Sequence, residues 1–208
     1  TYLPHYFFEV WAPWHADLAA ASLVRERPVV VGAMAGAGKS SLVTIARTLH
    51  AVLYGTDPFV VVGSMTEDLA SQFTALVKME LDENARILQD FGELKGTWKW
   101  EDKDFATRTG IRVKARGMGQ PFRGLRWRQH RPTLVILDDV EDEDLVLSQR
   151  RVQKALTWLL ATVLPRMTAQ GWGLVLVGNV ISRTGVIGTL LFNPEHAGFL
   201  RKVYPAED

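Results

Sequence analysis

The segment Ala33–Ser40 reads Ala-Met-Ala-Gly-Ala-Gly-Lys-Ser, which are the residue types of a loop that binds a nucleoside triphosphate. Small residues allow backbone N–H groups to close around a polyphosphate, and the start of a following helix directs further N–H groups at the same anion. In such a loop Lys39 reaches the β- and γ-phosphates, and the Ser40 hydroxyl binds Mg²⁺. We therefore expect ATP and Mg²⁺ to bind at Gly36, Ala37, Gly38, Lys39, Ser40 and Ser41.

The sequence on both sides of this loop fits the strand and the helix that it requires. Residues 28–32 are apolar and β-branched, as in a buried parallel strand, and residues 41–50 carry apolar side chains at helical spacing. Ala33 stands where such loops usually have their first glycine, which is acceptable if its φ is negative. The alternative is a glycine-rich turn with a solvated lysine, which the flanking segments and a second site disfavour.

The second site is a pair of aspartates at the end of another apolar strand, residues 134–137. Asp138 is placed to hold Mg²⁺ near Ser40. A second carboxylate is needed to polarise the attacking water, and two candidates remain: Asp139 has the adjacent position, and Glu141 has the longer reach. The acids that follow are expected in a solvated loop or at the capped start of a helix: Asp142, Glu143 and Asp144.

Other polar and aromatic residues have two interpretations each. Asn179 ends the apolar strand 173–178, where it either senses the γ-phosphate or serves a turn, and Arg183 beyond it is a possible phosphate contact. Trp14 and His15 lie upstream of the loop, where they either enclose an adenine ring or cover the edge of the sheet.

A basic segment separates the two halves of the site. Residues 105–116 alternate around a Thr109-Gly110 turn, which predicts a β-hairpin. Residues 105–131 contain no acid, so we expect them to contact phosphates, of a nucleic acid or of ATP on a neighbouring subunit; the alternative is a solvated sheet edge. The basic residues are Arg108, Arg112, Lys114, Arg116, Arg123, Arg126, Arg128 and Arg131.

The length fits one large domain or one and a half small ones, and the composition is that of a globular protein. The chain has 208 residues, of which 47% are hydrophobic and 23% charged, and it has no cysteine, which excludes disulfides and thiolate metal sites. No apolar stretch reaches the roughly 18–20 residues that cross a membrane. Helices are predicted at about 16–25, after a capping box at 64–67, and at 148–164, and a strand at 58–63, so helices and strands alternate as in a doubly wound α/β fold.

Taken together, these motifs resemble the ATPase domain of the large terminase subunit of tailed bacteriophages, which packages viral DNA into proheads. The resemblance covers nearly the whole chain and rests on residues 13–18, 33–40, 122–126, 131–142, Trp158 and 177–179. It implies a P-loop NTPase of the additional-strand, RecA-like type, with a mostly parallel central sheet flanked by helices and a basic β-hairpin insertion. Residues 1–208 then form one ATPase domain, with an adenine-side lead at about 1–27 and a tail at about 192–208.

The resemblance also implies a function. ATP hydrolysis would drive double-stranded DNA into a prohead in the host cell cytoplasm, with the portal protein and the small terminase subunit as partners. The motor would be a ring, typically of five subunits, although the isolated domain is expected to be monomeric. In such rings an arginine enters the neighbour's site, and Arg123 and Arg128 match that position ahead of Arg126.

Two departures from the family pattern bear on the chemistry. Many members have glutamate where this chain has Asp139, and many carry an arginine inside the loop where this chain has residues 34–37. Large terminases usually also contain an RNase H-like nuclease domain. Because the ATPase domain takes all 208 residues, we expect no nuclease activity from this chain.

Three other classes of protein stay open at this stage. A nucleic-acid translocase or helicase shares the aromatic lead and the loop, but usually has two ATPase cores. A small-molecule P-loop kinase would need a substrate lid and no basic hairpin. A non-catalytic structural protein would not depend on Lys39 for nucleotide binding.

Overall fold

The computed structural model describes residues 2–7, 11–167 and 170–204. Within these ranges, eight strands form one sheet in the order β3-β4-β5-β2-β6-β7-β1-β8. Neighbouring strands are parallel except for the antiparallel pairs β3–β4 and β4–β5. The strands are β1 Val29–Ala33, β2 Phe59–Ser64, β3 Lys95–Glu101, β4 Asp104–Thr107, β5 Arg112–Gly117, β6 Leu134–Asp138, β7 Gly173–Gly178 and β8 Leu200–Tyr204.

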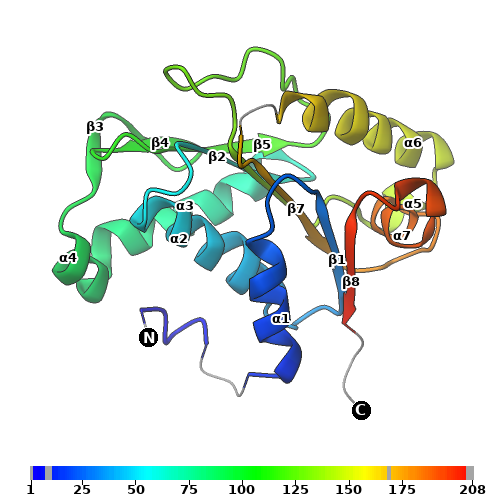
Figure 1. Ribbon diagram of the computed structural model, residues 1–208, viewed down its shortest axis with the longest axis horizontal. Helices are drawn as coiled ribbons and strands as arrows, with labels where there is room; N and C mark the ends of the chain where they lie inside the picture. Colours follow the sequence, from blue (N-terminus) through cyan, green and yellow to red (C-terminus); the bar gives the residue numbers. More distant parts are fainter. Residues whose placement is uncertain (1, 8–10, 168–169, 205–208) are drawn as a thin grey trace.

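Helices cover both faces of the sheet, as Figure 1 shows. On one face lie α1 Pro13–Ser22, the π-helical segment η1 Ser40–Ala46, α2 Arg47–Leu53, α3 Glu67–Glu83 and α4 Ala85–Phe91. On the other lie α5 Glu143–Val146, α6 Gln149–Thr157, its π-helical continuation η2 Trp158–Val163 and α7 Val186–Phe192. Two short 3₁₀ turns complete the described elements, η3 Leu164–Arg166 and η4 Pro194–His196.

The central strands are apolar throughout because both of their faces are covered. In β1, for example, Val29 and Val31 pack under α1 and α2, whereas Val30 between them packs toward α7. Alternation of side chains along a strand sends neighbouring residues to opposite faces, so a strand covered on both sides needs a continuous apolar run. The strands predicted at 58–63 and 173–178 are confirmed for the same reason.

The position of β7 confirms the additional-strand arrangement. β7 lies between β6 and β1 and is parallel to both, with Gly178 paired to Gly32 and Val177 paired to Asp138. The carboxyl ends of these three strands therefore meet at one edge of the sheet. This edge brings together the loop after β1, the aspartates at the end of β6 and Asn179 after β7.

The predicted hairpin is present but is not a separate insertion. β4 and β5 pair around Gly110, as expected, and β5 then runs parallel to β2, so the hairpin continues the central sheet. β3, which the sequence did not indicate, adds a further antiparallel strand.

Two predicted boundaries are wrong. α1 begins at Pro13 rather than Ala16, because the His15 ring accepts the Ala12 N–H at 2.9 Å and proline needs no N–H at the first helical position.

Residues 200–204 are not a tail but form β8, which pairs with the otherwise open edge of β1. Its sequence, with Arg201 and Lys202 in the middle, gives little strand signal; the pairing with β1 decides its conformation. Residues 205–208 lie outside the described part.

Candidate active site

The loop between β1 and η1 has the conformation that its glycines predict. Gly36 and Gly38 have φ values of 76° and 68°, in the left-handed region that side chains disfavour. A Cβ on Gly36 would meet nothing within 4 Å, so the backbone conformation, not space, requires glycine there. Ala33 is the last residue of β1 and is extended, which explains why alanine is acceptable in place of the usual glycine.

Lys39 lies inside the site rather than in solvent. Its side chain is buried, and its Nζ donates hydrogen bonds to the Met34 carbonyl at 3.3 Å and to Asn179 Oδ1 at 2.8 Å. The structure therefore brings together two predicted site residues that are 140 positions apart in the sequence. A lysine of a solvated turn would not be enclosed in this way.

Asp138 is fully buried at the end of β6 and faces the start of η1. Its Oδ2 accepts a hydrogen bond of 2.5 Å from Thr44, and its Oδ1 has no hydrogen-bond partner. Burial, together with the charge of Asp139, raises the pKa of Asp138 to about 6, although hydrogen bonds from Thr44 and Ser40 and the charge of Lys39 lower it. Asp138, Ser40 and Lys39 are thus close enough to interact.

These groups fit a magnesium ion. Mg²⁺ takes oxygen ligands and is usually held by one or two protein side chains together with substrate phosphates and water. The unpartnered Asp138 Oδ1 and the Ser40 hydroxyl are such oxygens. Among the described residues, no group of three or more His, Cys, Asp or Glu side chains gathers in a way that holds a metal without a nucleotide.

Thr44 is a site residue that sequence analysis missed. It is fully buried in η1, and its hydroxyl fixes one oxygen of Asp138. The signal was present, because Ser40 and Thr44 are four residues apart and therefore share a face of the helix that follows the loop.

The two candidates for the water-activating carboxylate have different surroundings. Asp139 is exposed, and it has a left-handed φ of 45°. Its backbone is fixed on both sides, since its N–H donates to the Val177 carbonyl at 3.1 Å and its own carbonyl accepts from Ser64 at 3.4 Å. Glu141 is buried instead, and its carboxylate accepts hydrogen bonds from the Val186 and Ile187 amides.

The aromatic lead contacts both the loop and the sheet edge. His15 Nε2 lies 3.1 Å from the Ala37 carbonyl of the loop. The ring of Trp14 stacks on that of His15, at 3.9 Å between centroids, and on Tyr204 of β8, at 5.0 Å. Trp14 therefore covers the edge strand while His15 supports the loop, and the adenine contact stays a prediction.

Two of the three candidate trans arginines, Arg126 and Arg128, lie away from the loop between β1 and η1 of their own chain. The Arg128 guanidinium lies next to Gly110, and the Arg126 carbonyl accepts a hydrogen bond from Arg112. Gly110 and Arg112 lie at the start of β5, so these residues are at the amino edge of the parallel strands, opposite the edge that carries Lys39. Arg123 is exposed and has no hydrogen bond or ion pair within the described part of the chain.

Much of the basic hairpin is neutralised within the chain. Arg112 and Lys114 pair with the buried Asp104 at 2.8 and 2.7 Å, and Arg116 pairs with Glu67 at 3.4 Å. Burial raises the pKa of Asp104, but hydrogen bonds and charges from its basic partners outweigh this and hold it below its ordinary value. In the part of the chain that the structure describes, positive charge without an acidic partner therefore remains at Arg108 of the hairpin and on the segment after β5.

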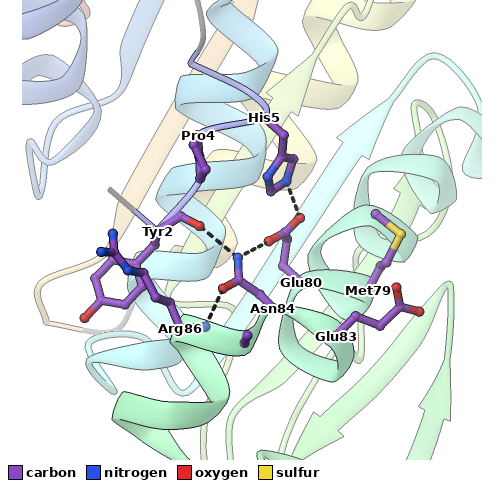
Figure 2. Close-up of a pocket in the computed structure, with 9 residues that line it drawn as sticks. Tyr2, Pro4, His5, Met79, Glu80, Glu83, Asn84 and Arg86 are labelled. Atoms are coloured by element: carbon purple, nitrogen blue, oxygen red, sulfur yellow. Dashed lines mark hydrogen bonds and ion pairs between the residues drawn. The ribbon is translucent and has the colours of Figure 1, made fainter.

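A separate hollow of about 450 Å³ lies where residues 2–5 cross the junction of α3 and α4 (Figure 2). The buried Glu80 accepts hydrogen bonds there from His5 and Asn84, both at 2.7 Å, and Asn84 also bonds to the Tyr2 carbonyl at 2.8 Å. These bonds attach the N-terminal segment to the helices. No residue of the loop between β1 and η1 lines this hollow.

Within the described residues, no helix has both the length and the apolar character needed to span a membrane.

Comparison with known proteins gives matches among solved structures. No protein-family model and no curated protein matches the sequence. The structure of the bacteriophage HK97 large terminase matches 96% of this chain with a TM-score of 0.63 and 14% identity. That of a large terminase from a thermophilic bacteriophage matches 95% with a TM-score of 0.54 and 11% identity. This chain spans 40% and 46% of those two proteins.

At these identities the likeness concerns the fold. The likeness rests on the described sheet, which is mostly parallel and flanked by helices. In this sheet β7 lies between β1, the strand before the loop, and β6, the strand that ends in Asp138. This chain therefore shares an α/β RecA-like P-loop ATPase fold with bacteriophage large terminases.

Proposed function

We propose that this chain is the Mg²⁺-dependent ATPase part of a terminase motor that moves double-stranded DNA into a prohead. The observation that carries the proposal is the meeting of Lys39, Asn179 and Asp138 at one edge of the sheet. The likeness to two large terminases in fold supports it.

In this proposal the amides of residues 36–41 and the Lys39 amine bind the phosphates of ATP. Lys39 exchanges its present acceptors, the Met34 carbonyl and Asn179, for phosphate oxygens. Ser40 and Asp138 would hold Mg²⁺, which offsets phosphate charge when bound. His15 supports the loop from outside through the Ala37 carbonyl, and Trp14, which stacks on His15, is proposed to contact the adenine ring.

Asp139 is the better candidate for orienting the attacking water, because its side chain is exposed next to Asp138 whereas that of Glu141 is enclosed.

An arginine from the next subunit would offset the charge that develops on the γ-phosphate, an effect that can be large. Arg123 and Arg128 are the proposed sources of this arginine, ahead of Arg126. Because Arg126 and Arg128 lie at the edge opposite Lys39, they would act on a nucleotide bound by a neighbouring subunit. Arg183, exposed between β7 and α7, is a second source of positive charge at the nucleotide edge.

The motor role implies the partners given for such assemblies: DNA, portal protein, small terminase subunit and further copies of this chain, in the cytoplasm of the host. DNA binding through phosphates should weaken steeply with salt. The chain is proposed to have no nuclease activity of its own.

The test is ATP turnover by the purified chain with and without Mg²⁺, for wild type, Lys39→Ala and Lys154→Ala. Lys154 is an exposed lysine of α6 and serves as the matched control. We expect Lys39→Ala to abolish measurable turnover and to weaken nucleotide binding, while Lys154→Ala behaves as wild type. Unaltered binding and turnover in Lys39→Ala would refute the site, and transfer of phosphate to a metabolite rather than water would refute the motor in favour of a kinase.

A further inference from the structure

Glu141 occupies a closed position beneath the start of α7. Its side chain is 7% exposed, and its Oε2 accepts hydrogen bonds from the Val186 amide and from the Ile187 amide, the latter at 3.4 Å. Gly185 makes room for it: a Cβ on this glycine would lie 2.7 Å from Oε2 and 3.0 Å from Oε1. The carboxylate thus joins the segment after β6 to a helix 45 residues further along the chain.

α7 in turn fixes the loop that begins at Asn179. Within this loop, the Gly185 N–H donates to the Ser182 carbonyl at 3.2 Å, and the Ser182 hydroxyl accepts from the Thr184 N–H at 3.2 Å. Gly188 of α7 packs directly on the loop, since a Cβ there would lie 2.1 Å from the Ser182 carbonyl. A shift of the first turn of α7 must therefore move the loop.

The other end of this loop is at the nucleotide site. Asn179 Oδ1 accepts the hydrogen bond from Lys39 at 2.8 Å. The loop is therefore held at two points, by Glu141 at the entrance to α7 and by Lys39 at the end of β7. Glu141 also lies two residues after Asp139, so the segment that carries the acids is joined to the loop that carries Asn179.

We propose that Glu141 is a positioning residue, which sets the place of residues 179–185 and thereby of Asn179 against Lys39, and that it is not the group that activates water. This inference rests on the proposed ATPase function. An activating base must reach a water beside the γ-phosphate, whereas Oε2 of this carboxylate is occupied by two amides, and Oε1, which has no hydrogen-bond partner, is enclosed with the rest of the side chain. Burial raises the pKa of Glu141 above its ordinary value, and the two amide bonds offset this only in part.

The experiment compares Glu141→Gln, Glu141→Ala and Asp139→Asn, with Glu143→Gln, an exposed acid of α5, as control. Steady-state kcat and KM for ATP are measured together with hydrogen exchange of the amides in residues 180–192. Glutamine keeps an oxygen that can accept from Val186 and Ile187, so we expect kcat within about threefold of wild type and unchanged exchange.

Glu141→Ala removes the acceptor. Exchange at Val186 and Ile187 should rise by about tenfold or more, and KM should rise by more than kcat falls, because Asn179 and Lys39 lose their placement. Asp139→Asn should behave in the opposite way, with kcat lower by about 10²-fold and exchange unchanged.

Gly185→Ala provides an independent variant in case Glu141→Ala fails to fold. Its φ of −70° permits alanine, but the new methyl group displaces the carboxylate, so it should reproduce the exchange and KM changes of Glu141→Ala. A loss of about 10²-fold in kcat for Glu141→Gln with unchanged exchange would overturn the inference and identify Glu141 as the base. Unchanged exchange and KM in both Glu141→Ala and Gly185→Ala would also overturn it. If the wild-type chain does not hydrolyse ATP, the proposed function fails. The hydrogen-exchange measurements then test by themselves whether Glu141 positions residues 179–185.

Discussion

The Lys39 amine lies 2.8 Å from the Oδ1 atom of Asn179, and this hydrogen bond connects the loop after β1 to the end of β7. β7 stands between the loop strand and the strand of Asp138, so a side chain at its tip is between the two halves of the site. The amide oxygen therefore fixes the position of the Lys39 amine at this edge of the sheet.

Asn179→Asp tests this contact through charge. The carboxylate would form an ion pair with Lys39 and repel the γ-phosphate, so we expect ATP affinity to fall by about tenfold or more. Asn179→Ala, which removes the contact without adding charge, should affect turnover more than binding. Fluorescent-nucleotide titration at low ionic strength measures the affinities, and equal affinity for Asn179→Asp and wild type would contradict the assignment.

Thr44→Val tests the contact with Asp138. Valine has the same shape as threonine but leaves the buried Oδ2 without its donor, so the free energy of unfolding should fall by about 1–3 kcal/mol. Thr48→Val is the matched control, because Thr48 is equally buried one turn later and its hydroxyl has no partner. Chemical denaturation measures the free energy of unfolding of both variants. If this free energy falls as much in Thr48→Val as in Thr44→Val, the hydrogen bond to Asp138 contributes nothing to stability.

Asp138 predicts a pH dependence of stability. Its pKa is raised from 3.8 to about 6, so the folded state favours the protonated acid. The free energy of unfolding is therefore highest below about pH 3.8, where Asp138 is protonated. This stabilisation is lost as the pH rises through about 6 and the buried carboxyl group ionises. Asp138→Asn should therefore be more stable than wild type at pH 8, by about 2 kcal/mol, while it loses Mg²⁺-dependent turnover.

Thermal unfolding of Asp138→Asn and wild type at pH 5 and pH 8, without Mg²⁺, measures this effect. The difference between the two proteins should be larger at pH 8. A constant difference across this range would show that Asp138 does not titrate as its burial implies.

The wild-type site predicts a related effect on metal binding. Protonation of Asp138 removes the charge that binds Mg²⁺, so Mg²⁺ affinity in the presence of a non-hydrolysable ATP analogue should fall by about tenfold per pH unit below about pH 6. Calorimetric titrations at pH 5 and pH 7 test it. Equal affinities at the two values would argue that Asp138 is not a ligand.

Arg123→Ala tests the contribution of a neighbouring subunit. The residue is exposed, so its loss should leave stability and ATP binding by the isolated chain unchanged and should lower turnover only in assemblies. Mixing Arg123→Ala with Lys39→Ala chains should restore part of the activity, since the interfaces at which the Arg123→Ala chain supplies the loop and the Lys39→Ala chain supplies the arginine are then intact. Arg150→Ala, an exposed arginine of α6, is the control, and mixtures without recovery would exclude Arg123 from a shared site.

The sequence by itself determined the parts of this protein that depend on neighbouring residues. The glycines of the loop, Lys39 and the apolar runs of β1, β2, β6 and β7 could be recognised because backbone conformation and strand burial leave a local pattern in residue type. The order of strands around β7 followed from the resemblance and is confirmed.

Only the tertiary structure decided which of these residues meet. Glu141 finds its partners 45 residues away, and Thr44 meets Asp138 across 94 residues, so no local pattern distinguishes an enclosed carboxylate from an exposed one. β8 forms because the edge of β1 offers unpaired backbone groups, although its own sequence gives little strand signal. The loop and the acids could be read from residue type, whereas their surroundings depend on contacts that form only when distant segments pack together.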